Sequence, residues 1–176
     1  MPTLVLDPAP VELEELLERR RRAGADRRDE VWQGVLHMVP GPGEAHMRIQ
    51  QQLAELLGPL ARTAGLTPLP GVNLGTKDDY RIPDAALLDI TGWGTYAPSA
   101  RLVVEILSPA DETEQKLPFY AQHGVEEVVI IDPAARTIRW LALSDAEYRP
   151  VERSTVINLA VDELAARIDW PPLQDR

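Results

Sequence analysis

The chain has 176 residues, of which 44% are hydrophobic and 26% are charged. This length and composition predict one globular domain with its own core, and they exclude a mostly disordered, collagen-like or coiled-coil chain. The lack of cysteine excludes a disulfide framework, a cysteine zinc site and a thiol nucleophile. A formal net charge of −10 argues against a general nucleic-acid binder, because an acidic surface repels polyanions.

The cytoplasm is the expected location. No run of apolar residues is long enough for a transmembrane helix, so no membrane association is expected. Residues 1–10 lack the basic start and the long apolar stretch of a signal peptide.

The N-terminal part is predicted to contain two helices separated by a hairpin. Residues 11–22 combine inward leucines with glutamates that precede arginines, an order that suits the helix dipole. Residues 31–39 contain two strand-like runs around Gln33-Gly34, as a β-hairpin does. The strongest helical periodicity covers residues 44–64, although Pro59 falls inside it, where a proline ends or kinks a helix.

The remaining chain is predicted to be rich in strands. The strand-like runs are residues 66–74, 80–88, 102–107, 125–131, 137–143 and 147–151. Helices are expected at residues 112–123, closed by Gly124, and at residues 161–168. This order predicts the α/β (α+β) class, as a single domain over residues 1–176 with one sheet and helices on its faces.

Two carboxylates stand in strands that are otherwise apolar, Asp84 and Glu105. A buried carboxylate needs a partner, and two of them close together favour a cation between them. Mg²⁺, or Mn²⁺ in its place, suits such a pair, because Mg²⁺ is often held by one or two carboxylates and keeps its other positions for water and phosphate. The alternative is that each carboxylate pairs with an arginine such as Arg81 or Arg101.

Lysine is scarce, because Lys77 and Lys116 are the only lysines among 18 basic residues. Lys116 lies in the predicted helix that follows the strand of Glu105, and Tyr120 lies one turn further on the same face. A strand-to-helix crossover could direct the ammonium to the mouth of the sheet, where it would stabilise phosphate charge and position an attacking water. The alternative is a solvated surface lysine.

The motifs resemble a known group of nucleases. Pro83-Asp84, then Glu105 in a strand, then a lysine resembles the PD-(D/E)XK nuclease superfamily. The longer segments around these residues resemble the Uma-two family of restriction-endonuclease-like proteins, over about residues 28–170. Those segments are residues 30–38, 40–46, 81–84, 103–109, 116–120 and 124–133. The resemblance implies a restriction-endonuclease-like core, in which helices flank a central mixed β-sheet.

The resemblance also implies roles for individual residues. The superfamily places its basic residue two positions after the glutamate, where this chain has Leu107, so Lys116 is the replacement. The implied catalytic residues are Asp84, Glu105 and Lys116. Asp84, Glu105 and the carbonyl of Ile106 would bind Mg²⁺, and Lys116 would orient or activate the water. The metal would polarise the phosphodiester and lower the pKa of its bound water.

Four residues are secondary candidates: Glu30, Glu44, His46 and Tyr120. In this fold an acidic residue from the N-terminal part can approach the metal, and Glu30 and Glu44 are the candidates. A carboxylate at a helix start, such as Glu44, is also explained by the helix dipole. His46 is either a base or a hydrogen-bonding partner. The histidines do not have the spacing of a zinc site.

The expected function is metal-dependent hydrolysis of DNA by an endonuclease, although the chain is acidic. Six arginines within residues 19–28 form either a phosphate-contacting edge or a helix face that neutralises glutamates. Two alternatives remain: a nuclease-fold protein that binds or assembles without cleaving, and a phosphodiesterase of small molecules. A homodimer is expected, because two-fold dimers are the commonest oligomers.

Overall fold

A computed structural model describes residues 11–90, 92, 94–109 and 111–172. Within them it confirms the predicted α/β (α+β) class. The helices are α1 (Val11–Arg22), α2 (Glu44–Thr63), α3 (Thr113–Gln122) and α4 (Val161–Arg167). Each begins and ends within one residue of its predicted range. None of the helices in this part of the chain is both long and apolar enough to cross a membrane.

The larger sheet contains six strands in the order β11-β10-β9-β8-β6-β3. The strands are β3 (Thr67–Leu69), β6 (Ala85–Leu88), β8 (Leu102–Ile106), β9 (Glu127–Asp132), β10 (Thr137–Ser144) and β11 (Glu147–Pro150). Strands β8 and β9 are parallel, and the other neighbours are antiparallel. Parallel neighbours need a crossover, which α3 supplies. Both edge strands contain a proline, Pro68 in β3 and Pro150 in β11.

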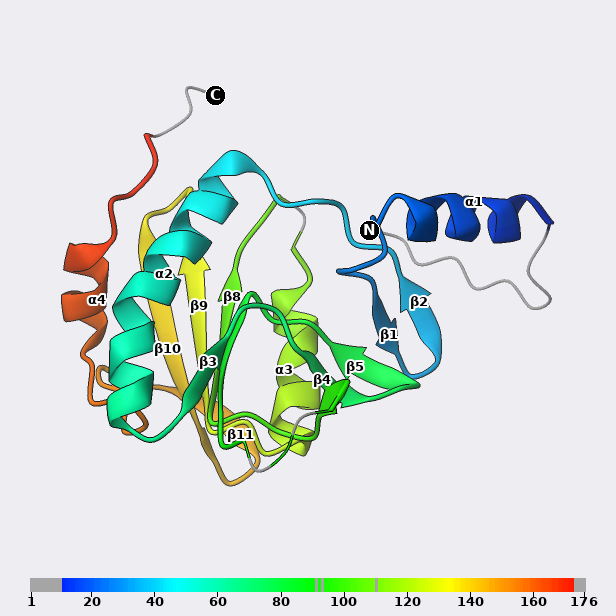
Figure 1. The fold of residues 1–176 in the computed structure, drawn as a ribbon. Coiled ribbons are helices and arrows are strands. Elements are labelled where there is room, and N and C mark those ends of the chain that lie inside the picture. Colours follow the sequence, from blue (N-terminus) through cyan, green and yellow to red (C-terminus); the bar gives the residue numbers. More distant parts are fainter. Residues whose placement is uncertain (1–10, 91, 93, 110, 173–176) are drawn as a thin grey trace.

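A second sheet of five strands lies beside the first (Figure 1), so the expectation of one sheet was wrong. Its order is β2-β1-β5-β4-β7. The strands are β1 (Glu30–Trp32), β2 (Val35–His37), β4 (Asn73–Thr76), β5 (Asp79–Arg81) and β7 (Tyr96–Ala97). The hairpin predicted over residues 31–39 is β1 and β2 of this sheet.

The two sheets arise because two predicted strands are each divided. The run 66–74 is interrupted at Pro70-Gly71, where Gly71 has a positive φ of 59°. The run 80–88 is interrupted at Pro83, which has no amide to donate to a strand ladder. The chain therefore leaves the smaller sheet after β5 and enters the larger one at β6.

The larger sheet is covered on both faces, with α2 and α4 on one side and α3 on the other (Figure 1). Alternate side chains of β8 supply the two cores. Leu102, Val104 and Ile106 join the core under α2 and α4. Val103 joins the core under α3, so the period of the strand directs Glu105 to the α3 side as well.

Helix α2 continues past Pro59 to Thr63, so the proline does not end it early. Its apolar face extends on both sides of the proline, because Leu57 and Ala61 are both buried in the core. This burial outweighs the hydrogen bond that the proline cannot make.

Gly75 in β4 permits a close approach between the smaller sheet and α3. Its φ of 122° is a conformation that other residues rarely adopt. A Cβ at this position would clash with the carbonyl oxygen of Asp79 and lie 2.8 Å from the ring of Phe119.

Candidate active site

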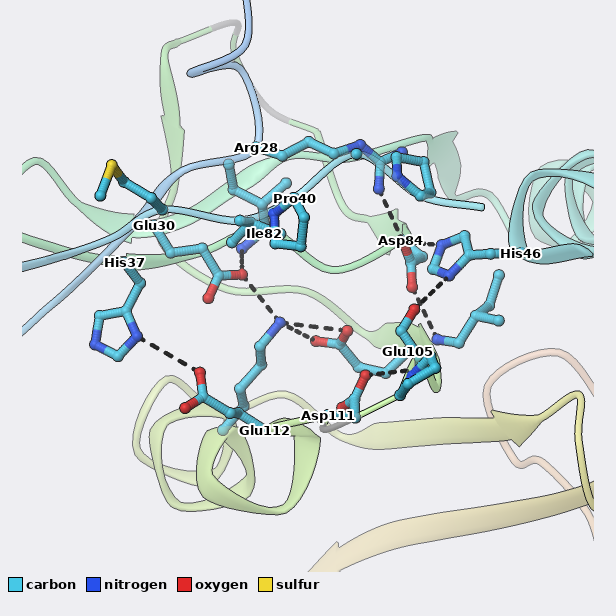
Figure 2. Close-up of a pocket in the computed structure, with 18 of the residues that line it drawn as sticks. Arg28, Glu30, His37, Pro40, His46, Ile82, Asp84, Glu105, Asp111 and Glu112 are labelled. Carbon is cyan, nitrogen blue, oxygen red and sulfur yellow. Dashed lines mark hydrogen bonds and ion pairs between the residues drawn. The ribbon is translucent and has the colours of Figure 1, made fainter. Parts of the chain in front are cut away.

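A cavity of about 420 Å³ is lined by residues of both sheets and of helices α2 and α3. Figure 2 shows Asp84, Glu105 and Glu30 around this space, with His46 and Arg28 beside Asp84. The cavity therefore lies where the chain crosses from β5 to β6.

Asp84 and Glu105 are brought together by the register of the larger sheet. Ala85 pairs with Val104, so the position before β6 lies opposite Glu105 in β8. The amide of Asp84 donates to the carbonyl of Val104 at 2.9 Å, and the amide of Ile106 donates to Asp84 Oδ2 at 2.8 Å. Both carboxylates are buried, at 7% exposed for Asp84 and 4% for Glu105.

Lys116 points inward, between two carboxylates. Its Nζ lies 3.0 Å from Glu30 Oε1 and 3.2 Å from Glu105 Oε1. The lysine is half-buried in α3, and Tyr120 on the next turn donates its hydroxyl hydrogen to Glu105 Oε1. The alternative of a solvated surface lysine therefore does not describe Lys116, although it describes Lys77, which is exposed between β4 and β5.

The pKa values of Glu105, Lys116 and Tyr120 are shifted because these side chains are buried against one another. Burial raises the pKa of Glu105 to about 8, although Lys116 and the hydroxyl of Tyr120 lower it. Burial lowers the pKa of Lys116, but the carboxylates of Glu105 and Glu30 raise it more, so the net shift is upward. Lys116 therefore stays charged at neutral pH. Burial and the Glu105 carboxylate raise the pKa of Tyr120, which keeps its hydroxyl protonated as a donor.

Glu30 reaches the cavity from β1, in the smaller sheet. It is 3% exposed, and both of its oxygens are held. Oε1 accepts hydrogen bonds from the amide of Ile82 at 2.8 Å and from Lys116, and Oε2 accepts one from the indole Nε1 of Trp32 at 2.7 Å. Of the two acids considered from the N-terminal part, Glu30 is thus the one that lines the cavity.

Glu44 lies elsewhere. It is exposed in the first turn of α2, and it is not among the residues that line the cavity. Its position agrees with the interpretation that a carboxylate at a helix start stabilises the helix dipole.

His46 contacts Asp84. Its Nε2 lies 2.7 Å from Asp84 Oδ1, and its Nδ1 lies 3.4 Å from the hydroxyl of Ser108. A proton on Nε2 would be donated to the carboxylate, which leaves Nδ1 to accept one from Ser108. His46 therefore orients Asp84 from the start of α2.

Arg28 and Gln50 are neighbours of Asp84 that the sequence analysis did not predict. Arg28 lies 3.3 Å from Asp84 Oδ1, and Gln50 donates to the backbone carbonyl of Asp84 at 2.6 Å. In the sequence, Arg28 is distinguished only as one of six arginines within residues 19–28. The arginines suggested as partners have other contacts: Arg81 pairs with Asp79, and Arg101 pairs with Asp89.

Three arginines of the arginine-rich segment pair with nearby acids. Arg21 and Arg22 pair with Glu18 on α1, and Arg20 pairs with Asp29 at 2.6 Å. For Arg20, Arg21 and Arg22 these contacts agree with the interpretation of a neutralised helix face, whereas Arg28 lies beside Asp84.

The cavity lining has an excess of negative charge. Its carboxylates are Glu30, Asp84, Glu105, Asp111 and Glu112, and its fixed cations are Arg28 and Lys116. In the described part of the chain, no three His, Asp, Glu or Cys side chains form a metal-binding group by themselves. Two carboxylates beside an open cavity fit Mg²⁺, which takes its remaining ligands from water and phosphate, better than they fit structural zinc.

Comparisons with known proteins agree with this fold. Among solved structures, the chain is similar to a putative nuclease belonging to DUF820 from Anabaena variabilis ATCC 29413. The TM-score is 0.66 at 17% sequence identity, over 79% of this chain and 90% of that chain. A comparison with curated proteins gives no significant match. The family model Uma2, with the description "Putative restriction endonuclease", matches residues 12–168. Because this match covers most of the chain, the protein belongs to the Uma2 family of putative restriction endonucleases.

Proposed function

We propose that this protein is a metal-dependent endonuclease that hydrolyses phosphodiester bonds of DNA, with Mg²⁺ or Mn²⁺ as its cofactor. The observation that carries the proposal is the meeting of Asp84, Glu105 and Lys116 around one cavity. These residues come from the position before β6, from β8 and from α3. Membership of a family described as restriction endonucleases supports the choice of reaction.

Asp84 and Glu105 would hold the metal, with the backbone carbonyl of Ile106 as a further ligand. When bound, the metal would polarise the phosphodiester and lower the pKa of a bound water. The excess of carboxylates in the lining supports a cation there, since buried negative charge is costly without compensation.

The protein's own side chains would orient the reactants. Lys116, charged and directed into the cavity, would hold the attacking water and stabilise charge that develops on the phosphate. His46 and Arg28 would fix the orientation of Asp84. Arg28, at 36% side-chain exposure, is also placed to contact a phosphate.

The net charge of −10 makes DNA binding dependent on the metal, because a divalent ion reverses the local sign of the field. We therefore expect DNA to bind weakly in EDTA and more tightly with Ca²⁺, an ion that fills oxygen sites and commonly fails to support cleavage. A gel-shift titration in the two buffers measures this difference.

The test of the proposed function is nicking of supercoiled plasmid with Mg²⁺ or Mn²⁺. The single variants Asp84→Ala, Glu105→Ala and Lys116→Ala are expected to lose at least a hundredfold in rate, the usual effect of removing one catalytic group. Two matched controls are Lys77→Ala, at the other lysine, and Glu147→Ala, at an exposed acid in β11. Both should cleave at the wild-type rate.

The outcome separates the proposal from its alternatives. Equal nicking by all preparations indicates a contaminating nuclease and overturns the assignment. Metal binding without cleavage of DNA, together with hydrolysis of bis-p-nitrophenyl phosphate, would favour a phosphodiesterase of small molecules. The absence of calorimetric Mg²⁺ binding at millimolar concentration would favour a nuclease-fold protein that binds or assembles without cleaving.

A further inference from the structure

The side chain of Arg81 lies at the centre of an aromatic cluster next to the cavity. It is 4% exposed, and its guanidinium carbon lies 4.3 Å from the ring centroid of Trp32 and 4.1 Å from that of Phe119. His37 also stacks on Trp32, with centroids 4.1 Å apart and ring planes 16° apart. Arg81 and His37 thus hold the indole of Trp32 from the smaller sheet, and Phe119 of α3 contacts Arg81.

The guanidinium of Arg81 is itself fixed by a backbone carbonyl and by the carboxylate of Asp79. Its Nη1 donates to the carbonyl of Val31 at 2.9 Å and to Asp79 Oδ1 at 2.8 Å. A cation stacked on a desolvated tryptophan ring contributes more than one at the surface. Arg81 is not among the residues that line the cavity, and its contacts connect β1, β5 and α3.

The indole N–H of Trp32 connects this cluster to the cavity. It donates to Glu30 Oε2 at 2.7 Å, and the amide of Ile82 donates to Glu30 Oε1 at 2.8 Å. Glu30 is thus held by two neutral donors, and its Oε1 is presented to Lys116 at 3.0 Å. Lys116 also contacts both oxygens of Glu105, at the longer distances of 3.2 and 3.4 Å, so the ammonium is shared between the two carboxylates.

We infer that Trp32, supported by Arg81, is a positioning residue: it fixes Glu30, and Glu30 holds the Lys116 ammonium so that Glu105 remains available to a metal ion. Without Glu30 held in this way, Lys116 would pair with Glu105 alone, and an ammonium paired with Glu105 alone competes more strongly with a metal cation for its oxygens. The catalytic meaning of the inference rests on the proposed function, whereas the position of Lys116 can be measured without it.

The chain contains a matched control for Trp32. Trp140 makes the same kind of bond, from its indole Nε1 to Glu127 Oε2 at 2.8 Å. That pair lies at the other end of the parallel strands, since Glu127 pairs with Leu102 while Glu105 pairs with Ile130. The variants Trp32→Phe and Trp140→Phe therefore each remove one indole–carboxylate bond, and only the first removes it beside the cavity.

The first measurement is an NMR spectrum of the lysine ammonium groups in ¹⁵N-lysine protein without metal. Only two lysines occur, and Lys77 is exposed, so the slowly exchanging signal belongs to Lys116. Trp32→Phe should shift this signal or broaden it by faster exchange, and Glu30→Gln should do the same. Trp140→Phe should leave it unchanged. A wild-type Lys116 signal in folded Trp32→Phe or Glu30→Gln protein would overturn the inference, whether or not the protein cleaves DNA.

The second measurement is calorimetric Mn²⁺ binding together with cleavage kinetics. Trp32→Phe is expected to weaken Mn²⁺ binding and to lower kcat by about tenfold, the effect of losing one hydrogen bond to a charged group, with KM unchanged. Trp140→Phe should change neither quantity. The double variant Trp32→Phe, Glu30→Gln should have the same Mn²⁺ affinity and kcat as Glu30→Gln alone, because Trp32 acts through Glu30. If Trp32→Phe lowers kcat in the Glu30→Gln background as much as it does in wild type, Trp32 acts independently of Glu30 and the inference is overturned.

Discussion

Removing the Lys116 ammonium tests whether the buried charges of the cavity depend on one another. In Lys116→Met the side chain stays unbranched and is one atom shorter, and it leaves Glu30 and Glu105, both nearly inaccessible, without their shared cation. Breaking a buried ion pair from one side typically costs about 3 to 5 kcal/mol. For a chain of this length, that loss lowers Tm by roughly 6 to 20 °C.

The loss of stability in Lys116→Met should depend on pH, and the pKa shifts determine the direction of this dependence. The pKa of Glu105 is already raised to about 8, and removing the ammonium raises it further. A carboxylate with a raised pKa in the folded state binds its proton more tightly there than in the unfolded state. Stability is therefore lost as the pH rises above the pKa that the carboxylate has in the unfolded state. Lys116, whose pKa is raised, stays charged over this range. The destabilisation of Lys116→Met should therefore be smaller near pH 5 than near pH 8, because only the part that arises from Glu105 changes over this range.

The assay is urea unfolding of wild-type, Lys116→Met and Lys77→Met protein at pH 5, 6.5 and 8, in EDTA and in Mg²⁺. Lys77→Met should behave as wild type. Mg²⁺ should restore more stability to Lys116→Met than to wild type, because a divalent ion replaces the missing charge and binding to the folded state is stabilising. A loss that is the same at pH 5 and pH 8 in EDTA, and that Mg²⁺ does not reduce, would refute this reasoning.

Three further variants test other contacts. Tyr120→Phe removes a hydrogen bond that lowers the pKa of Glu105, so the pH at which Mn²⁺ affinity reaches half its maximum should move upward in calorimetric titrations. Glu127→Ala should lower the unfolding free energy in urea by about 3 to 5 kcal/mol, since this buried carboxylate accepts bonds from several donors that would lose their partner. Gly75→Ala should lower Tm, because the new Cβ meets the Asp79 carbonyl at a positive φ. Equal Tm values for Gly75→Ala and wild type would contradict that account.

The helices and most strands could be predicted because their signals are local. Apolar residues at helical spacing predicted α2, and the apolar run of β8 with one charged residue drew attention to Glu105. The division into two sheets could not be predicted in the same way. It depends on Pro83 interrupting one run of residues, and on which sheet each half then joins.

The candidate site could be predicted only for those residues that are unusual in their local sequence. Asp84 and Glu105 were evident as charges within apolar strands, and Lys116 was evident from the scarcity of lysine. Trp32 falls within the hairpin predicted over residues 31–39 and was not predicted as a site residue, although the period of a strand directs it to the same side as Glu30. Nothing local connects Arg28 to Asp84, because 56 positions separate them and the fold alone brings them together.

The prolines of the two outer strands also limit how copies of this chain can associate. An open sheet edge is a template on which another strand can add, and long unprotected edges promote fibre formation. Pro68 in β3 and Pro150 in β11 each remove one donor from such a template. Regular strand addition is therefore interrupted at both ends of the six-stranded sheet, so lateral growth into extended aggregates is disfavoured even at high protein concentration.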